Sequence, residues 1–334
     1  MITRRLGLAA GLASLAAGRA RAQNVTWGAT WPDRAITFTI PFPPGGSADL
    51  LARLVADRMA PLLAVGARVV VENRAGAGGL IGSDYARRQP ADGHALLLAT
   101  PSTHGTIPAL QPETTPYDPI ADFAPVAVLG RSPIALAVPN ASPYRDPQAL
   151  IAGLRASPGA ASWGSSGSGS VGQLAGELMN LSAGGLQAEH IPYRGGAPLV
   201  EALTKGEVQY AWEPLGSLAA GARDGLFRII GMGSAVRHPL LPEVPTLQEA
   251  GLAGFEASTW NVMLAPRGTP PAVVARLNAA ANAVLSLPDV RARLSAAGID
   301  AVNDSTPAST GVFLAGELAK FKDIVARGHL SLAR

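Results

Sequence analysis

Four times along this chain, an apolar run ends in a glycine-rich loop that opens into a helical pattern, and no other sequence feature constrains the fold more strongly. The four loops occupy residues 43–47, 76–79, 164–170 and 193–196. Alternation of strand, loop and helix is typical of α/β proteins, in which mostly parallel strands form a sheet flanked by helices. Two loops lie early in the chain and two lie near its middle, which predicts two such units.

Apolar periodicity predicts the individual elements. We expect strands at residues 36–40, 68–72, 95–99, 134–138, 161–163, 189–191, 208–212 and 227–231. We expect helices at residues 48–63, 80–88, 147–156, 171–183, 197–205, 271–285, 288–297 and 307–325, whereas residues 108–125 show little periodicity.

The chain length also favours two lobes. At roughly 150 residues per domain, 334 residues are enough for two domains. The helical tail has too few strands for a third sheet, so we expect it to pack back on the first unit. Lobe 1 is then formed by residues 23–132 and 260–334, and lobe 2 by residues 133–259. The two connections between the lobes are expected near residues 130–136 and 256–264.

The first 22 residues have the layout of a secretory signal peptide. Arg4 and Arg5 precede a 12-residue apolar stretch, and residues 20–22 form an A-x-A cleavage site. The apolar stretch is far shorter than the ~20 residues of a membrane span. We therefore expect residues 1–22 to be removed on export, by the general or the twin-arginine route, and the mature protein to be periplasmic.

The charge balance argues against nucleic acid as a partner. The whole chain has 27 basic and 24 acidic residues, but four of the arginines lie in the first 22 residues. The remaining part has 23 basic against 24 acidic residues, which gives no excess of positive charge for a phosphate backbone. The absence of cysteine excludes disulfides, iron–sulfur sites and thiol catalysis.

The glycine-rich loops predict an anion-binding site. A loop that opens a helix presents unpaired backbone N–H groups at the positive end of the helix dipole. Because strand ends share one edge of a parallel sheet, all four loops can face a common cleft. The loops contain only Arg74 and Arg194 as fixed positive charges but several serines, which favours a carboxylate over a phosphate ligand.

Residues 167–172 match the GxGxxG pattern of dinucleotide-binding folds, and Glu189 follows at about the expected distance. The preceding strand is short and interrupted by Ser and Gly, so we interpret the match as a carboxylate-binding loop and expect no cofactor. The sequence contains no GxSxG, Walker lysine or HExxH motif, and its histidines lack metal-ligand spacing. His94 and His238 fall in polar turns and are expected to be solvated. His104 follows a strand and either lines the cleft or lies on the surface.

These motifs together resemble the Bug-type solute receptors of tripartite tricarboxylate transporters, over essentially the whole mature chain. The matching segments are PPGGSAD (43–49), ENRAGAGG (72–79), DGHALL (92–97), YDP (117–119), DFAP (122–125), GSSGSGS (164–170), YRGG (193–196), LPEVPT (241–246) and EAG (249–251). The resemblance implies a type II periplasmic-binding-protein fold of the Venus-flytrap kind, whose two lobes close on a small carboxylate without catalysis.

The resemblance also implies which residues bind the ligand, since the family holds carboxylates with loop N–H groups, hydroxyls and ordered waters from both lobes. Carried over to this chain, the ligand-binding residues are Pro44, Gly45, Gly46, Ser47, Ala77, Gly78, Thr100, Ser166, Gly167, Tyr193, Gly195, Gly196 and Glu213. The family often has Asp where this chain has Glu213, and Lys where it has Arg194. Glu213 is one methylene longer, so we expect it to crowd the cleft or to meet an amine or hydroxyl of the ligand.

The function implied by the resemblance is a monomeric receptor that delivers a small organic carboxylate to transmembrane permease subunits. Two alternatives stay open at this point: an exported hydrolase of unknown type, and a ligand sensor without a transport role. If neutral donors hold the carboxylates, no group in the site should titrate between about pH 5.5 and 8.5. Affinity is then expected to be nearly constant across that window.

Overall fold

The computed structural model describes residues 31–328, so the predicted signal peptide lies outside the described residues. Its strands are β1 (Ile36–Ile40), β2 (Val69–Asn73), β3 (Ala95–Ala99), β4 (Phe123–Pro139), β5 (Ser162–Ser165), β6 (Glu189–Pro192), β7 (Tyr210–Pro214), β8 (Phe227–Met232), β9 (Ser258–Pro266) and β10 (Asp300–Ala301). Its α-helices are α1 (Ser47–Leu63), α2 (Leu80–Arg87), α3 (Ile107–Leu110), α4 (Pro147–Ala156), α5 (Val171–Ser182), α6 (Gly196–Lys205), α7 (Leu215–Arg223), α8 (Pro271–Ser286), α9 (Pro288–Ala296) and α10 (Pro307–Gly328).

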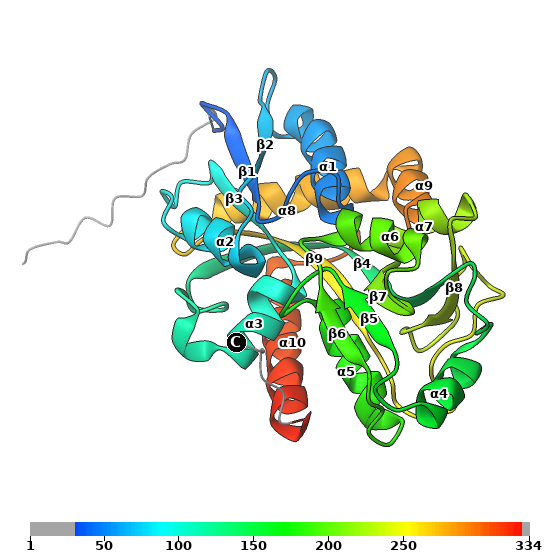
Figure 1. Cartoon of the computed structure of the whole chain (residues 1–334). Helices are drawn as coiled ribbons and strands as arrows, with labels where there is room; N and C mark the ends of the chain where they lie inside the picture. The colour runs from blue at the N-terminus through cyan, green and yellow to red at the C-terminus, as the bar shows by residue number, and fades with distance from the viewer. Residues whose placement is uncertain (1–30, 329–334) are drawn as a thin grey trace, which may run out of the picture.

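Lobe 1 is built on three parallel strands in the order β2-β1-β3. The five residues of β3 are all buried and apolar, as expected of a parallel strand covered on both faces. One apolar cluster joins the sheet to α1, α8 and α9, and a second cluster on the other face includes residues of α2 and α10. Lobe 1 is therefore a three-layer arrangement of helices, sheet and helices (Figure 1).

Lobe 2 repeats this arrangement with the parallel strands β7, β5 and β6. Apolar residues of α4 and α5 pack with one part of the core, and those of α6 and α7 pack with another. The helix α7 was not expected from the sequence, where only the strand before it was predicted. It follows β7 directly and gives lobe 2 a third strand-to-helix unit.

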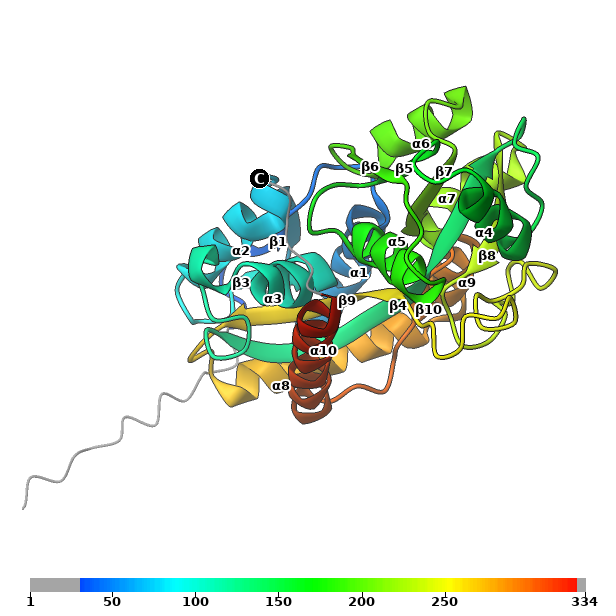
Figure 2. The ribbon, with the colours of Figure 1, turned by 60° about the horizontal axis from the view of Figure 1, so that its bottom comes forward.

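The two lobes share the long strand β4, which is the main difference from the expected topology. The first part of β4 pairs antiparallel with β9 in lobe 1, and its last residues pair antiparallel with β7 and β8 in lobe 2. Figure 2 shows β4 and β9 running side by side, with β4 continuing into lobe 2. The predicted strand 134–138 is thus only the end of a 17-residue strand. The two expected connections, near residues 130–136 and 256–264, lie largely within β4 and β9.

The α/β class and the two-lobed architecture are confirmed, with antiparallel strands joining the two parallel sets. The boundary between lobes at residues 132 and 133 falls inside the continuous strand β4 and stays a prediction. Residues 102–106 form a helical turn that continues into α3. The sequence shows little periodicity over residues 108–125, so most of α3 lies in that stretch and residues 102–106 precede it. Between residues 31 and 328, no helix combines the length and the apolar character needed to cross a bilayer.

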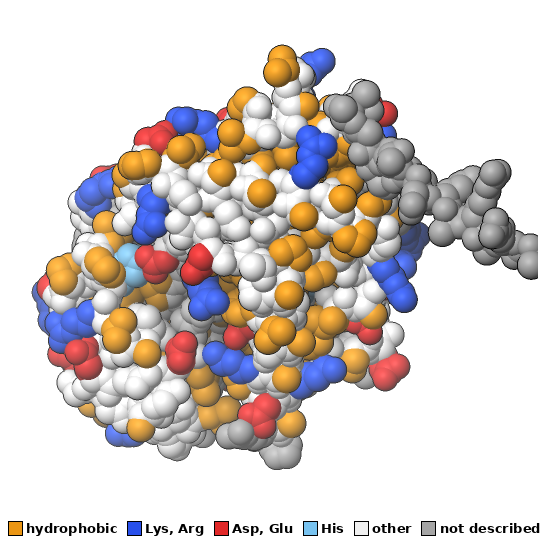
Figure 3. Space-filling model, turned by 180° about the vertical axis from the view of Figure 1, so that it is seen from behind, with side chains coloured by type: hydrophobic (Ala, Val, Ile, Leu, Met, Phe, Trp, Pro, Cys, Tyr) orange, Lys and Arg blue, Asp and Glu red, His pale blue; other side chains and the backbone are white. Residues whose placement is uncertain are grey.

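Charges of both signs are mixed on the face shown in Figure 3. Lys and Arg side chains alternate there with Asp and Glu side chains, and no continuous basic area forms on that face. Charged side chains are also paired across elements, as in the contact of 2.5 Å between Arg58 of α1 and Asp289 of α9. This face accordingly lacks the basic surface that binding to a phosphate backbone requires.

Candidate ligand-binding site

The predicted site residues all lie at the carboxyl ends of the parallel strands, in loops or at the first residues of helices. Within lobe 1 they follow β1, β2 and β3, and within lobe 2 they follow β5 and β6 or end β7. In lobe 1 these residues are Pro44, Gly45, Gly46, Ser47, Ala77, Gly78 and Thr100; in lobe 2 they are Ser166, Gly167, Tyr193, Gly195, Gly196 and Glu213. Each lobe therefore presents its loops along the sheet edge at which open α/β sheets bind their ligands.

The loop between β1 and α1 is held in place by Asp49. Its carboxylate accepts hydrogen bonds from Gly45 N (3.0 Å), Arg53 Nε (3.0 Å) and Asn73 Nδ2 (2.9 Å). Burial acts to raise the pKa of Asp49, but these hydrogen bonds outweigh it and hold the pKa below its usual value. Asp49 and Arg53 thus form an ion pair across one turn of α1, which helps to fix the loop between β1 and α1.

The loops after β2 and β3 pack against each other within lobe 1. Gly79 is buried, and a Cβ added there would lie 2.5 Å from Thr103 Cγ2. Thr103 Oγ1 also accepts a hydrogen bond from Thr100 N at 3.1 Å. The hydroxyl of Thr100 is buried without a hydrogen-bond partner among the described residues. Thr100 thus has the free hydroxyl that the predicted role requires.

In lobe 2, the hydroxyl of Ser165 organises the loop after β5. It lies 2.7 Å from His190 Nε2, 3.3 Å from Gly167 N and 3.2 Å from Ser170 Oγ. Burial lowers the pKa of His190 to about 4, so this imidazole is neutral at physiological pH. Tyr193 N donates to Ser165 O at 2.9 Å, which ties the loop after β6 to the loop after β5.

Glu213 is the second-to-last residue of β7 and is only 3% exposed. Its carboxyl group lies against Gly196, the first residue of α6, where an added Cβ would be 2.8 Å from Oε1. Burial raises the pKa of Glu213 to about 7, although hydrogen bonds from Ser166 and Ser217 act in the opposite direction. The expectation that no site residue titrates between pH 5.5 and 8.5 is therefore wrong.

Three helices begin at the site without a side-chain cap. Gly46, Gly195 and Pro214 occupy the N-cap positions of α1, α6 and α7, and none of them provides a capping hydrogen bond. By contrast, Ser170 caps α5 by accepting from Gln173 N. The first N–H groups of α1 and α6 are thus available to an anion, and the helix dipoles favour one there. In the first turn of α7, by contrast, Gly216 N already donates to Ser132 Oγ at 3.3 Å.

Fixed positive charge contributes little to this edge of the sheets. Arg53 is bound by Asp49 and Asn73, and Arg74 pairs with Glu72 at 2.6 Å while covering the ring of Tyr85. Arg194 is exposed on the loop before α6. The available donors in this candidate site are mainly backbone N–H groups and hydroxyls.

The two lobes approach each other at the starts of α1 and α7. A Cβ added at Gly216 would lie 3.1 Å from Ser47 Cβ and 2.9 Å from Ala297 O. Gly216 lies directly before Ser217, whose hydroxyl acts on Glu213. The first turn of α1 in lobe 1 therefore lies close to the Glu213 region of lobe 2.

The histidines differ from the expectations. His104 is fully buried against Tyr117 and Phe123, and burial lowers its pKa to about 3, so it belongs to the core of lobe 1 and neither lines a cleft nor lies on the surface. His94 and His238 are also buried, at 6% and 5% exposure, because neighbouring residues cover their polar turns. None of these three has the exposure expected of a solvated histidine.

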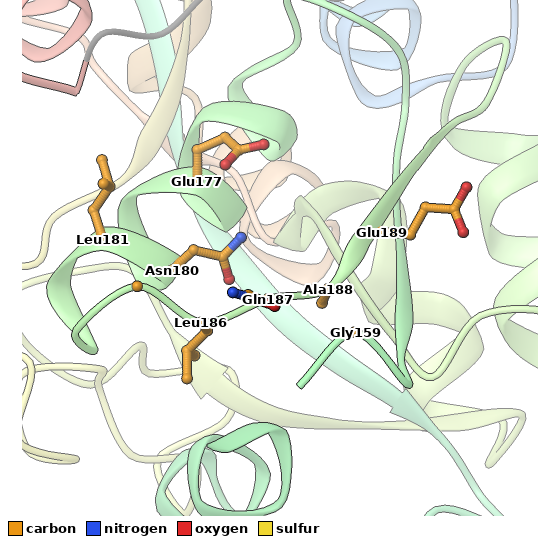
Figure 4. A pocket seen from close by; sticks show the side chains of 9 residues that line it. Gly159, Glu177, Asn180, Leu181, Leu186, Gln187, Ala188 and Glu189 are labelled. Carbon is orange, nitrogen blue, oxygen red and sulfur yellow. The ribbon is translucent and has the colours of Figure 1, made fainter. Parts of the chain in front are cut away.

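A pocket of about 510 Å³ lies elsewhere in lobe 2, between the end of α5 and the start of β6 (Figure 4). Glu177, Asn180 and Glu189 are among its lining residues. Because Glu189 begins β6, this pocket lies at the sheet edge opposite the loops. None of the thirteen predicted residues lines it.

Four residues that shape the site were not among the predicted ones: Asn73, Ser165, His190 and Ser217. Ser217 could have been found from the sequence, because the pattern of strand followed by helix also fits residues 210–223. Ser165 lies within a predicted loop, but its central place depends on contacts with other strands. Asn73 and His190 act through contacts that only the folded chain creates.

The chain is similar in sequence to a family of known proteins. The family model described as "Tripartite tricarboxylate transporter family receptor" matches residues 51–330. The protein BugT of Bordetella pertussis (strain Tohama I) is 35% identical over 296 residues, which cover 89% of this chain and 90% of BugT.

Two solved structures are similar over nearly the whole fold. Rpa4515 of R. palustris with adipate has a TM-score of 0.85 and 32% identity, covering 90% of this chain and 99% of that one. MatC (Rpa3494) from Rhodopseudomonas palustris with bound malate has a TM-score of 0.82 and 32% identity, covering 88% of this chain and 100% of that one. These likenesses confirm the expected two-lobed binding-protein fold.

Proposed function

Because this chain belongs to the tripartite tricarboxylate transporter receptor family, we propose that it is a periplasmic receptor for a small organic dicarboxylate. The ligand would be held between the two lobes and delivered to the permease subunits of a membrane transporter. Members of this family are solute-binding receptors and not enzymes, so the hydrolase alternative is no longer needed. The proposal requires neither a cofactor nor a metal.

The observation that carries this proposal is the set of uncapped helix starts on both lobes. Lobe 1 contributes the start of α1, and lobe 2 contributes the start of α6. A ligand with one carboxylate at each end would satisfy N–H groups on both lobes at once. The adipate and malate in the similar structures have this chemistry and support the choice of a dicarboxylate.

The proposed binding residues are the thirteen named above, acting through backbone N–H groups, hydroxyls and ordered waters. The left-handed backbone of Gly45 and Gly195, at φ of +90° and +107°, allows close approach of the ligand to the chain. Neutral donors suffice for this, because carboxylates bind well to N–H groups at helix starts.

Ligand binding is tested by a thermal-shift and calorimetric screen of the mature chain. Adipate, malate and a tricarboxylate are compared with monocarboxylates and with adipamide, which keeps the shape of adipate but has no charge. At 100 times its dissociation constant, a true ligand adds ~2.7 kcal/mol to the free energy of unfolding. If no carboxylate stabilises the protein more than adipamide does, the proposed function is wrong.

Export and delivery need their own measurements. The intact mass of the periplasmic protein should correspond to a chain that begins at Gln23, and a mass that includes Arg19 and Arg21 would contradict the proposed signal peptide. Uptake of the identified carboxylate should then require both this receptor and its permease subunits. Binding without any effect on uptake would indicate a sensor instead.

A further inference from the structure

Glu213 has a buried carboxyl oxygen that lacks a hydrogen-bond partner. The side chain is 3% exposed, and its Oε2 has no partner among the described residues. Buried polar atoms in native proteins are nearly always paired, because leaving one unpaired costs free energy. An unpaired carboxyl oxygen beside the uncapped starts of α6 and α7 therefore indicates a partner that arrives with the ligand.

Among the described residues, the groups that the contacts place beside Glu213 are neutral. They are Ala135 on β4, Ser166 in the loop after β5, Gly196 of α6 and Ser217 of α7. No cation contributes to the raised pKa of Glu213, which results from burial. Hydrogen bonds from Ser166 and Ser217 favour the ionised form, but burial outweighs them and raises the pKa of Glu213.

We propose that Glu213 binds the ligand as a neutral acid, donating a hydrogen bond from Oε2 to a ligand carboxylate oxygen, so that ligand binding takes up a proton. This inference rests on the proposed function and names how the same site recognises its ligand. An ionised Glu213 would repel a carboxylate placed at the start of α6, since two like charges at such a distance disfavour each other's ionisation. A neutral carboxyl group removes the repulsion and forms a short, strong hydrogen bond of O–H···O⁻ type.

The same free oxygen could also accept a hydrogen bond from an ammonium group of an amino-acid ligand. That arrangement needs an ionised Glu213, and the hydrogen bonds from Ser166 and Ser217 do not outweigh the cost of ionising this buried group. It would also place a cation next to the positive ends of two helices, which the dipoles disfavour. The geometry thus favours an unsubstituted or hydroxylated dicarboxylate over an amino acid.

The experiment is calorimetric titration of the mature protein with adipate and with malate between pH 6 and pH 8.5. Each titration is repeated in two buffers of different ionisation enthalpy, so that protons taken up on binding are counted directly. We expect the affinity of the native protein to fall about thirtyfold across this range, because proton uptake is required above the pKa of Glu213. At pH 8.5 the uptake should approach one proton per ligand.

Two variants make the result specific. Glu213→Gln keeps the shape and a donor but cannot ionise, so its affinity should match that of the native protein at pH 6 and change little up to pH 8.5. Glu177→Gln removes a half-buried acid on α5 whose pKa is also raised by burial, and it should leave the pH profile unchanged. Titration of the ligand itself affects all three proteins equally.

The outcomes separate this inference from the proposed function. If no carboxylate binds the native protein at pH 6, the receptor proposal fails, and the inference fails with it. If carboxylates bind but affinity is independent of pH, or if Glu213→Gln keeps the same pH dependence, only the role of Glu213 is wrong. Tighter binding of an amino dicarboxylate as pH rises would show an ionised Glu213 and would also overturn it. If the variant does not fold, the proton count of the native protein still decides.

Discussion

Gly167 turns the chain from β5 towards α5 at a φ of +139°, a backbone conformation that residues with a Cβ rarely adopt. A Cβ added there would also lie 3.2 Å from Tyr193 O, so a side chain would press on the neighbouring site loop. We predict that Gly167→Val abolishes carboxylate binding while the fold is retained, as measured by calorimetry alongside circular dichroism. Dinucleotides should not bind to either protein.

The control for this prediction is Gly184→Val. Gly184 has a φ of +89° but is exposed, and an added Cβ there would meet nothing within 4 Å. The control shares the backbone strain without touching the site, so it should bind carboxylate normally. Equal loss of carboxylate binding in both variants would mean that general backbone strain causes the loss. Micromolar binding of NAD would show that residues 167–172 do not form a carboxylate-binding loop.

Asp49 links the stability of lobe 1 to the shape of a site loop. In Asp49→Asn, an NH2 group that only donates replaces one carboxylate oxygen and faces donor groups of Gly45, Arg53 or Asn73. At least one hydrogen bond is therefore lost. We predict a loss of about 1–3 kcal/mol in the free energy of unfolding at pH 7, and weaker ligand binding. Urea unfolding measures the first effect, with the exposed Asp57→Asn on the same helix as control.

The pH dependence of this effect has a definite sign. The folded-state pKa of Asp49 is lowered, so the ionised group contributes stability above its unfolded pKa of about 3.9. That contribution disappears as pH falls through the folded-state pKa. The difference between native protein and Asp49→Asn should therefore shrink on acidification below about pH 4, and a difference that is constant down to pH 2 would contradict the role of the charge.

The sequence predicted where the candidate site residues lie in the fold better than it predicted whether their side chains are buried or ionised. The glycine-rich loops were predictable because the pattern of strand, loop and helix is local. The buried states of His104 and Glu213 were not, because burial depends on residues distant in the chain: Tyr117 and Phe123 for the histidine, and Ser217 for the glutamate.

Among the elements, the β4 strand connects the lobes through the side chain of Ser132. Its hydroxyl donates to Gly298 O at 2.6 Å and accepts from Gly216 N at 3.3 Å. It therefore joins the turn after α9 to the first turn of α7. We predict that Ser132→Ala leaves both backbone groups unpaired and lowers the free energy of unfolding by about 1–3 kcal/mol.

Chemical denaturation of the variant tests this prediction. Ser182→Ala, at the exposed end of α5 in lobe 2, removes a hydroxyl without such contacts and should change stability by less than about 0.5 kcal/mol. Equal stability of Ser132→Ala and the native protein would mean that the two hydrogen bonds contribute no net stability.

The helices and parallel strands were largely predictable, whereas the strands that join the lobes were not. Pro125, Gly130 and Pro133 interrupt β4, and such residues normally argue against a central strand. The register between β4 and β9 shifts near Pro125 and again near Gly130, so irregularities in the pairing accommodate these residues. Only pairing with partners far along the chain makes this segment a continuous strand.

At the scale of the whole molecule, the two lobes are joined by the paired strands β4 and β9 and are brought together by helices. The side chains of α10 and α5 line a small space of about 20 Å³ between the lobes, and Leu174 of α5 shares an apolar cluster with Phe321 of α10. A relative movement of the lobes must therefore bend or twist two strands and slide α5 over α10. Such motions of packed elements are common in domain closure.

We predict that ligand binding closes the lobes and makes the protein more compact. A dicarboxylate that forms hydrogen bonds to the start of α1 and to the start of α6 binds more tightly when the lobes are closed, because both helix starts then lie near it. A ligand shifts the equilibrium between the open and closed states by its difference in affinity for them. Small-angle scattering of the mature protein should show a smaller radius of gyration with saturating adipate than without it. Gly167→Val with the same adipate should show no compaction, because its lobe 2 loop cannot bind the ligand. A radius of gyration that stays the same in the native protein, under conditions where calorimetry shows saturation, would indicate a rigid pocket formed before the ligand arrives.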